Sequence, residues 1–248
     1  MAYNFVVAPD FPPNLFSGWH TLNTQLQKRA DIAVHLLNPA SAAEQAQMLD
    51  SQDVSLVYAN PFDAAKLIRE KGYKVIARPV GKSDEMVIVS SAKGDIKTLE
   101  DLKAGAKIAM ADNRDVKLIG LRLLEAVDLT EADLSFEITE TYQAAIKKVA
   151  QGEADAAFFI AEIFSTLSNL TRSQLHVLIE SDLADITHVL LAKGDFEHAN
   201  KVSEALISLK NDTSGQMVLE ELGMKNGFEA VDEEEAEFMI DLMETLLD

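Results

Sequence analysis

The segment with the most concentrated charged chemistry reads Asp112-Asn113-Arg114-Asp115-Val116-Lys117. It follows the apolar stretch 107–110 and precedes an amphipathic stretch, so the pattern places it at a turn from a strand into a helix. Arg114 and Lys117 lie three residues apart, which puts both on one side of a starting helix. Free N–H groups and the helix dipole favour an anion there, and arginine can donate two parallel hydrogen bonds to an oxyanion. Asn113, Arg114 and Lys117 are therefore candidate anion contacts.

The carboxylates of the same turn support a different chemistry. Asp112 and Asp115 would repel an anion at close range, and paired carboxylates can act as general acid and base. Glu162 follows the apolar stretch 156–160, where a carboxylate suits recognition of an amine or a hydroxyl. It could equally be a first-turn glutamate stabilised by the helix dipole. The residues alone leave an anion site, a site for a neutral or cationic ligand and an acid–base site open.

Other candidate residues stand directly after predicted buried strands. Ligands of α/β sheets bind beyond the carboxyl ends of strands. Tyr58 and Asn60 end such a strand at 54–58, and Asp10 and Phe11 follow the strand predicted at 5–8. We expect all four to contact a ligand, although Asn60 can also be the cap of the helix that Pro61 begins.

Three further residues are candidates with an equally plausible structural role. Tyr142 begins a helix predicted at 142–151, but a buried tyrosine usually finds a structural hydrogen bond. Thr187 and His188 lie where the chain enters a strand predicted at 188–192. A single histidine is more often a neutral structural residue than a ligand contact, so both interpretations of His188 stand.

Patterns typical of metal, nucleotide and covalent chemistry are missing from the sequence. It contains no cysteine, no HExxH pair, no GxGxxG or Walker A loop and no GxSxG elbow. The acidic run 232–235 lacks the alternating oxygen ligands and the glycine of a calcium loop. We therefore expect no cofactor, no metal and no catalytic residues.

Short apolar stretches alternate regularly with longer amphipathic ones along the chain. The order β-α-β-α-β-α-β at the start predicts a mostly parallel sheet covered by helices, and the middle of the chain repeats it. A single helix is expected from about 161 to 170. Polar segments at 80–85 and 180–187 are candidate crossings between two lobes. We thus predict an α/β fold with lobe 1 formed by 1–82 and 186–248 and lobe 2 by 83–185.

Composition and charge narrow the class of partner. The 248 residues carry 22 Lys and Arg against 41 Asp and Glu, a formal net charge of −19. Such a chain lacks the basic surface with which proteins bind phosphate backbones or anionic membranes. No apolar run is long enough to span a bilayer. We expect a monomer that binds neither nucleic acid nor membrane.

Four segments in order resemble the phosphate- and phosphonate-type solute-binding proteins of ABC transporters. The segment 53–62, DVSLVYANPF, resembles the family's "vDlayfgP", and 96–109 is similar to its "I.sl.DLkGkk.a". The segment 141–157, TYQAAIKKVAQGEADAA, is similar to "sheaal.av..G.vDaa", and 222–228, LGMKNGF, to the closing "lgi.GF". This resemblance implies a two-lobed class II periplasmic-binding-protein-like fold, each lobe a mostly parallel sheet flanked by helices, joined by two hinge crossings.

The resemblance also departs from the family at one place. The family usually carries a Ser/Thr-rich turn after the strand at 107–110, and this turn holds the anion through hydroxyl and backbone N–H groups. In this chain the hydroxyls are replaced by the charged residues of 112–117. Either Arg114 and Lys117 take over as donors, or the ligand is not a phosphonate.

The expected function is that of a non-enzymatic solute-binding protein. It would capture a small polar ligand, phosphonate- or phosphate-like, in the cleft between the lobes for an ABC transporter permease. The alternatives are a cytosolic ligand-sensing protein and a cofactor-biosynthesis enzyme on the same fold. The first residues lack the basic region of a signal peptide. We expect a periplasmic protein if a leader was removed, and a cytoplasmic one otherwise.

Overall fold

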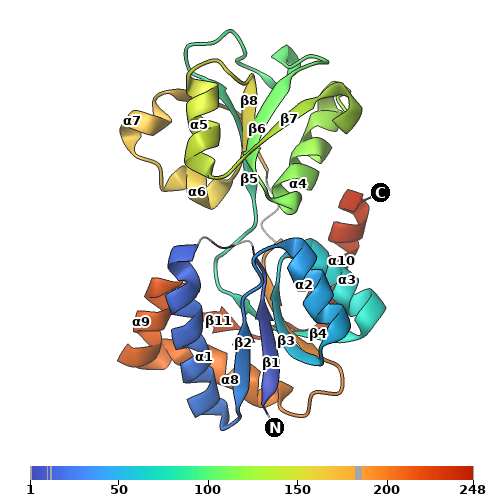
Figure 1. The fold of residues 1–248 in the computed structure, drawn as a ribbon, viewed down its shortest axis with the longest axis vertical. Helices are drawn as coiled ribbons and strands as arrows, with labels where there is room; N and C mark the ends of the chain where they lie inside the picture. The colour runs from blue at the N-terminus through green and yellow to red at the C-terminus, as the bar shows by residue number, and fades with distance from the viewer. Residues whose placement is uncertain (1, 10, 12, 182–185, 248) are drawn as a thin grey trace. The chain divides into compact units, whose positions relative to one another are not determined.

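A computed structural model describes residues 2–9, 11, 13–181 and 186–247 of the chain, and Figure 1 shows its helices and strands. Its contacts divide the chain into two units. Unit 1 comprises Met1–Ser83 and Asp185–Thr245, and unit 2 comprises Asp84–Ala184 with Leu246–Asp248. Each unit has its own sheet, so each is described by itself.

Unit 1 is built on a six-stranded sheet in the order β11-β4-β10-β3-β1-β2. β1, next to the edge strand β2, pairs in parallel with β2 and β3, whereas β10 runs antiparallel to β3 and β4, and β11 antiparallel to β4. The strands are β1 (Tyr3–Val7), β2 (Val34–Leu37), β3 (Val54–Ala59), β4 (Tyr73–Pro79), β10 (Val189–Lys193) and β11 (Phe228–Glu229).

Helices cover both faces of this sheet. One face packs against α1 (Phe16–Ala30), α8 (Ala199–Ile207) and α9 (Thr213–Glu221), and its core includes Trp19, Val202 and Leu219. The other face packs against α3 (Pro61–Lys71) and α10 (Glu233–Leu247) through Ala64, Leu67 and Met239. The remaining helix of this unit is α2 (Ala42–Ser51). Every residue of β3 is buried, as a central strand with helices on both faces requires.

Unit 2 is built on a five-stranded sheet in the order β7-β6-β8-β5-β9. β6 pairs in parallel with β7 and β8, and β5 runs antiparallel to β8 and β9. The strands are β5 (Met86–Ser91), β6 (Lys107–Ala111), β7 (Ser135–Thr139), β8 (Ala156–Ile160) and β9 (Leu175–Glu180). The helices are α4 (Arg114–Leu124), α5 (Tyr142–Ala150), α6 (Ala161–Ser165) and α7 (Asn169–Arg172).

The α/β class with helices on both sides of each sheet is confirmed, but one detail of the prediction is wrong. Most strands of each sheet run in the same direction, as predicted, and the sheets are mixed because β10 and β5 each enter between strands that run the other way. The helix expected at 161–170 is two short helices, because Ser168 accepts a hydrogen bond from the Thr171 N–H and starts α7 anew. The two-residue strand β11 was not predicted.

Side-chain caps fix where the helices at the strand ends begin. Asn60 caps α3, Asn113 caps α4 and Thr141 caps α5, each accepting a hydrogen bond from a backbone N–H three residues on. Such a bond satisfies one of the N–H groups that a helix start leaves unpaired. Each of these three helices therefore starts within a few residues of the end of the preceding strand.

Candidate functional site

In unit 1 the candidate residues gather where β1 and β3 end and β10 begins. The parallel strands β1 and β3 end at the same edge, and the Ala8 N–H donates to the carbonyl of Tyr58 at 2.9 Å. Because β10 runs antiparallel to β3, its first residue Val189 pairs with Ala59. His188 therefore stands beside the end of β3, although it is far away in the sequence.

An aromatic cluster occupies this edge. The Phe11 ring lies 5.0 Å from His188, 5.3 Å from Trp19 and 5.8 Å from Tyr58, measured between ring centroids. Tyr58 lies 4.8 Å from Trp19 and stacks on His188. Trp19, Tyr58 and His188 are buried and Phe11 is partly exposed, so Phe11 is the ring that this cluster offers to solvent.

Asn60 sits next to this cluster in a hydrogen-bonded network. Its Oδ1 accepts from the Asp63 N–H at 2.8 Å, and its Nδ2 donates to Asp63 Oδ2 at 3.2 Å. Gln45 of α2 donates to the same Oδ2 at 2.9 Å. The capping role that the sequence allowed is thus present, and a ligand contact of Asn60 stays a prediction. Thr187 is also buried, beside His188.

In unit 2 the candidates gather where β6, β7 and β8 end. The parallel pairing of β6 with β7 and β8 brings the starts of α4, α5 and α6 to one edge. Asn113 Oδ1 accepts from the Val116 N–H at 3.0 Å, and Asn113 Nδ2 lies 3.5 Å from Tyr142 Oη. The Tyr142 ring in turn lies 6.0 Å from Phe159. Asn113 and Tyr142 therefore connect the first turns of α4 and α5.

The two cations of the 112–117 turn lie in different surroundings. The Arg114 side chain is exposed and forms no ion pair or hydrogen bond with any described residue. The Lys117 ammonium lies 2.5 Å from Glu131 Oε1 and 4.6 Å from the centre of the Phe136 ring. Lys117 is thus held within unit 2, and Arg114 is the cation of this turn that stays available to a ligand.

The two carboxylates of the turn also differ. Asp112 is exposed, whereas Asp115 is only 7% exposed. Arg114 and Asp115 are neighbours in the sequence, but no ion pair between them is present among the described residues. The turn therefore presents one exposed carboxylate next to one exposed guanidinium.

Asp10 lies outside the described residues, and of Glu162 only the backbone is described, in the first turn of α6 directly after β8. Part of the crossing predicted at 180–187 also lies outside the described residues.

Sequence reasoning missed three residues that support these edges. Trp19 packs against Phe11 and Tyr58, and its buried Nε1–H has no acceptor among the described residues. Gln45 donates a hydrogen bond to the carboxylate of Asp63, which also bonds to Asn60. Thr139 at the end of β7 donates to the Met110 carbonyl at 3.1 Å. The single tryptophan was the one available signal, but its helical spacing marked it only as a core residue.

The described residues form neither a metal-binding cluster nor a membrane-spanning helix. No group of three or more His, Asp or Glu side chains there is arranged to hold a metal ion. None of the described helices combines the length and the apolar character that crossing a bilayer requires.

The family comparison decides the identity of this fold. A family model described as "ABC transporter, phosphonate, periplasmic substrate-binding protein" matches residues 5–236. The chain belongs to this family. The resemblance noted in the four sequence segments is thereby confirmed, and the chain is a solute-binding protein of the ABC-transporter kind. No curated protein matches it by sequence.

Solved structures show the same fold at low sequence identity. PhnD1 from Prochlorococcus marinus, in complex with methylphosphonate, is 15% identical with a TM-score of 0.80, over 99% of this chain and 98% of that one. A binding protein of an ABC phosphonate transporter from Pseudomonas aeruginosa is 16% identical with a TM-score of 0.72, over 100% and 89%. The aliphatic sulphonate binding protein SsuA from Escherichia coli is 17% identical with a TM-score of 0.66, over 99% and 91%. The class II periplasmic-binding-protein-like fold is confirmed.

Proposed function

We propose that this family member binds a small phosphonate- or phosphate-like oxyanion. The observation that carries the proposal is the exposed guanidinium of Arg114 at the start of α4, which has no partner among the described residues, in a chain with a net charge of −19. A guanidinium can donate two hydrogen bonds to one oxyanion, and the N-terminus of a helix adds a favourable potential. The methylphosphonate named for PhnD1 is an anion of this class.

The proposal extends to residues of both units. Asn113, Arg114 and Tyr142 are the contacts expected from unit 2, with Lys117 and Glu162 as further members of the predicted set. Phe11, Tyr58, Asn60, Thr187 and His188 are those expected from unit 1, with Asp10 beside them. The aromatic cluster of unit 1 suits the organic part of a phosphonate, because Phe11 offers an apolar ring while the guanidinium binds the charged part.

A thermal-shift screen tests the ligand class. The panel is methylphosphonate, inorganic phosphate, phosphite, methanesulfonate, an amino acid and a polyol. A ligand at 100 times its dissociation constant adds about 2.7 kcal/mol to the free energy of unfolding, which such a screen resolves. Stabilisation by the phosphorus oxyanions supports the proposal. Stabilisation by the amino acid or the polyol alone overturns it in favour of a ligand recognised by carboxylates.

Binding is proposed to leave the ligand chemically unchanged and to bring the two lobes together. Hinge closure requires only that the ligand binds the closed form more tightly than the open one. Small-angle scattering should show a smaller radius of gyration with methylphosphonate than without it. A ³¹P NMR spectrum of methylphosphonate should be the same before and after incubation with the protein. A new phosphorus signal would identify an enzyme instead.

The proposed partner is the permease of an ABC transporter, and the proposed site of action is the periplasm. This follows from the family, whose members are periplasmic substrate-binding proteins. We propose that the chain acts as a monomer. Sedimentation equilibrium tests the monomer, and detection of the native protein in a periplasmic extract tests the location. A purely cytosolic protein would favour the ligand-sensing alternative.

A further inference from the structure

One edge of the unit 1 sheet is open over half the length of its strand. β4 pairs with β10 from Tyr73 to Ala77, but on its other side β11 reaches only Arg78 and Pro79. No other described strand pairs with β4 there. An unpaired strand edge presents backbone N–H and C=O groups to which a second extended chain can bind.

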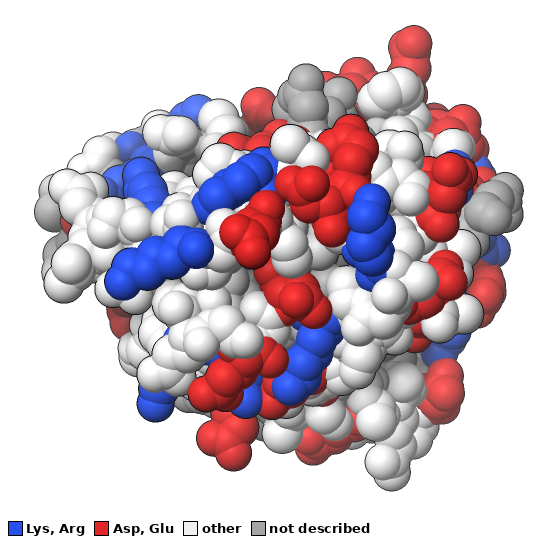
Figure 2. Space-filling model, turned by 90° about the horizontal axis from the view of Figure 1, so that it is seen from above, with Lys and Arg blue, Asp and Glu red and all other residues white. Residues whose placement is uncertain are grey.

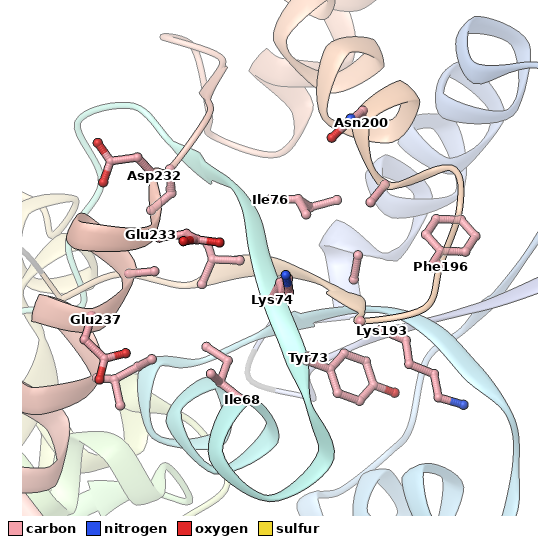
Figure 3. A pocket seen from close by; sticks show the side chains of 17 residues that line it. Ile68, Tyr73, Lys74, Ile76, Lys193, Phe196, Asn200, Asp232, Glu233 and Glu237 are labelled. Carbon is pink, nitrogen blue, oxygen red and sulfur yellow. The ribbon is translucent and has the colours of Figure 1, made fainter.

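A pocket of about 390 Å³ lies along this open edge (Figure 3). Tyr73, Lys74, Val75 and Ile76 of β4 line it, with residues of the α8 and α10 regions. Apolar and polar side chains both line the pocket, and the apolar ones are Ile68, Val75, Ile76, Ala192, Phe196, Ala199, Val231, Ala236 and Ile240. The pocket is within the size range of sites that bind ligands.

Helices stand on both sides of the strand beside the pocket. Val75 and Tyr73 pack in the same cluster as Met239 of α10, whereas Ile76 packs against the cluster that holds Val202 of α8. The pocket is therefore a slot with a sheet edge along its length and a helix at each side. A single extended chain fits such a slot, but the edge of a second folded sheet would meet the helices.

The open part of the edge is short. The pairing passes from Leu190 with Ala77 to Leu191 with Val75, so Ile76 is the extra residue of a bulge. The Ile76 carbonyl accepts a hydrogen bond from Ser203 Oγ of α8 at 2.7 Å. The stretch that stays free for pairing is thus Tyr73–Val75, and Ile76 and Ala77 separate it from the residues that pair with β11.

The charges around the slot favour a basic occupant. Asp232 and Glu233, at the start of α10, place carboxylates in the lining of the pocket, whereas Glu235 beside them is paired with Arg78 at 3.0 Å. Glu233 forms no ion pair with any described residue, whereas Glu237 is paired with Arg69 at 2.7 Å and Lys193 with Asp53 at 2.8 Å. Lys74 also lines the pocket, has no ion pair among the described residues, and carries the opposite charge to Glu233. A second copy of a chain carrying −19 would be repelled.

We propose that this slot binds an extended peptide segment of a partner protein that contains lysine or arginine. The segment adds to the sheet antiparallel to β4, on the side of β4 where β11 pairs, and brings a basic side chain to Glu233. This binding surface is independent of the ligand site proposed above.

Fluorescence anisotropy with the full chain tests the proposal. The probe is a labelled hexapeptide of alternating lysine and valine. The first control peptide has the same charge but proline in place of valine, since proline lacks the N–H donor and cannot pair along the strand. The second control alternates glutamate and valine. The lysine–valine peptide should bind to the protein. The proline peptide should bind with roughly 10- to 30-fold lower affinity, because it cannot form the strand hydrogen bonds.

Variants of the slot complete the test. Ala236→Trp fills the slot, and Glu233→Lys reverses the unpaired rim charge; both should weaken the lysine–valine peptide roughly tenfold. The matched control Glu220→Lys makes the same charge change on the exposed surface of α9 and should leave binding unchanged. Should Ala236→Trp misfold by circular dichroism, Ala199→Trp on the α8 side replaces it.

Three results would overturn the proposal. Equal binding of the proline peptide would show attraction by charge alone. If Glu220→Lys weakened peptide binding as much as Glu233→Lys, this too would show that the peptide is attracted by charge alone. Self-association that Ala236→Trp abolishes would make a second copy of the chain the occupant of the slot.

Discussion

The phenol ring of Tyr58 stacks on the imidazole of His188, with the ring centroids 5.6 Å apart and the planes inclined by 25°. Tyr58 lies near the end of β3, and His188 immediately precedes β10. The antiparallel pairing of these two strands brings the rings together. The stack combines an apolar surface with three polar atoms, the Tyr58 hydroxyl oxygen and the two His188 ring nitrogens, at the edge where ligands of α/β sheets bind.

His188→Phe tests whether the imidazole contacts the ligand. Phenylalanine keeps a ring in the stack but removes both nitrogen atoms. A hydrogen bond to a charged group is worth about 1.5–3 kcal/mol, so the affinity for methylphosphonate should fall roughly 10- to 150-fold. Isothermal titration calorimetry measures this. His198→Phe is the matched control, because His198 also packs edge-on against aromatic rings, those of Tyr3 and Phe196. If both variants bound methylphosphonate with the same affinity, His188 would have a structural role only.

Arg114→Ala tests the proposed anion contact. Removal of an exposed guanidinium that has no partner among the described residues should leave the melting temperature nearly unchanged. The affinity for methylphosphonate should fall roughly 10- to 150-fold, since a charge-assisted hydrogen bond is lost. Arg122→Ala removes the same charge from the last turn of the same helix, and calorimetry should find wild-type affinity for it. An Arg114→Ala protein that binds as well as wild type would contradict the anion site.

Local chemistry made part of this fold and site predictable. Largely apolar stretches such as Val54–Ala59 are buried strands, and Asn60 is the cap that the sequence allowed. The direction of β10 was not predictable, because it depends on where the chain re-enters the sheet and not on the residues of the strand. The two-residue strand β11 is too short to carry a pattern.

The arrangement of side chains was less predictable for a related reason. The aromatic cluster joins Phe11, Trp19, Tyr58 and His188 through the pairing of β3 with β10, which no local pattern encodes. The i,i+3 spacing suggested that Arg114 and Lys117 act together. Instead Lys117 is paired with Glu131, a residue beyond the end of α4. Long-range ion pairs of this kind decide which charges stay available.

Asn60→Ser separates capping from ligand contact. Serine is a good N-cap and keeps an acceptor for the Asp63 N–H, so the variant should lose only about 1 kcal/mol of stability, that of the bond from Asn60 Nδ2 to Asp63 Oδ2. It removes the amide group, so methylphosphonate affinity should fall if Asn60 touches the ligand. The comparison is Ser41→Ala, which removes the cap of α2, where Ser41 Oγ accepts from the Glu44 N–H. That change should cost about 1 kcal/mol in urea unfolding and leave affinity unchanged. Unchanged affinity of Asn60→Ser would leave Asn60 a cap only.

Gly120→Ala tests the seating of α4 on the unit 2 sheet. A Cβ at this position would lie 2.3 Å from Cε2 of Phe158 in β8, far closer than atoms can approach. Overpacking of this kind costs about 1–3 kcal/mol, measured by urea unfolding. Gly94→Ala is the control, because its Cβ would meet Ser91 at an ordinary 3.5 Å. The double variant Gly120→Ala with Phe158→Leu should recover part of the loss. A fully stable Gly120→Ala protein would contradict this packing.

Asp212 makes the stability of unit 1 depend on pH in the acid range. The Gly215 N–H, the Ser214 hydroxyl and the Arg29 guanidinium all donate to its carboxylate and lower its pKa from 3.8 to about 2. A carboxyl whose pKa is lowered by folding stabilises the protein above the unfolded pKa, and this stabilisation is lost as the pH falls toward the folded one. Asp212→Asn keeps a good cap for α9 but removes the charge. It should be less stable than wild type at pH 7 in urea unfolding.

The difference between Asp212→Asn and wild type should shrink as the pH falls from about 4 to about 2, because the wild-type carboxyl then becomes neutral as well. The control Glu220→Gln, on an exposed residue of the same helix, removes a charge that forms no ion pair with the described residues. It should not show this dependence. A difference for Asp212→Asn that is the same at pH 7 and at pH 2.5 would mean that the charge of Asp212 does not stabilise unit 1. The contribution of Asp212 would then be the cap alone, which asparagine supplies equally well.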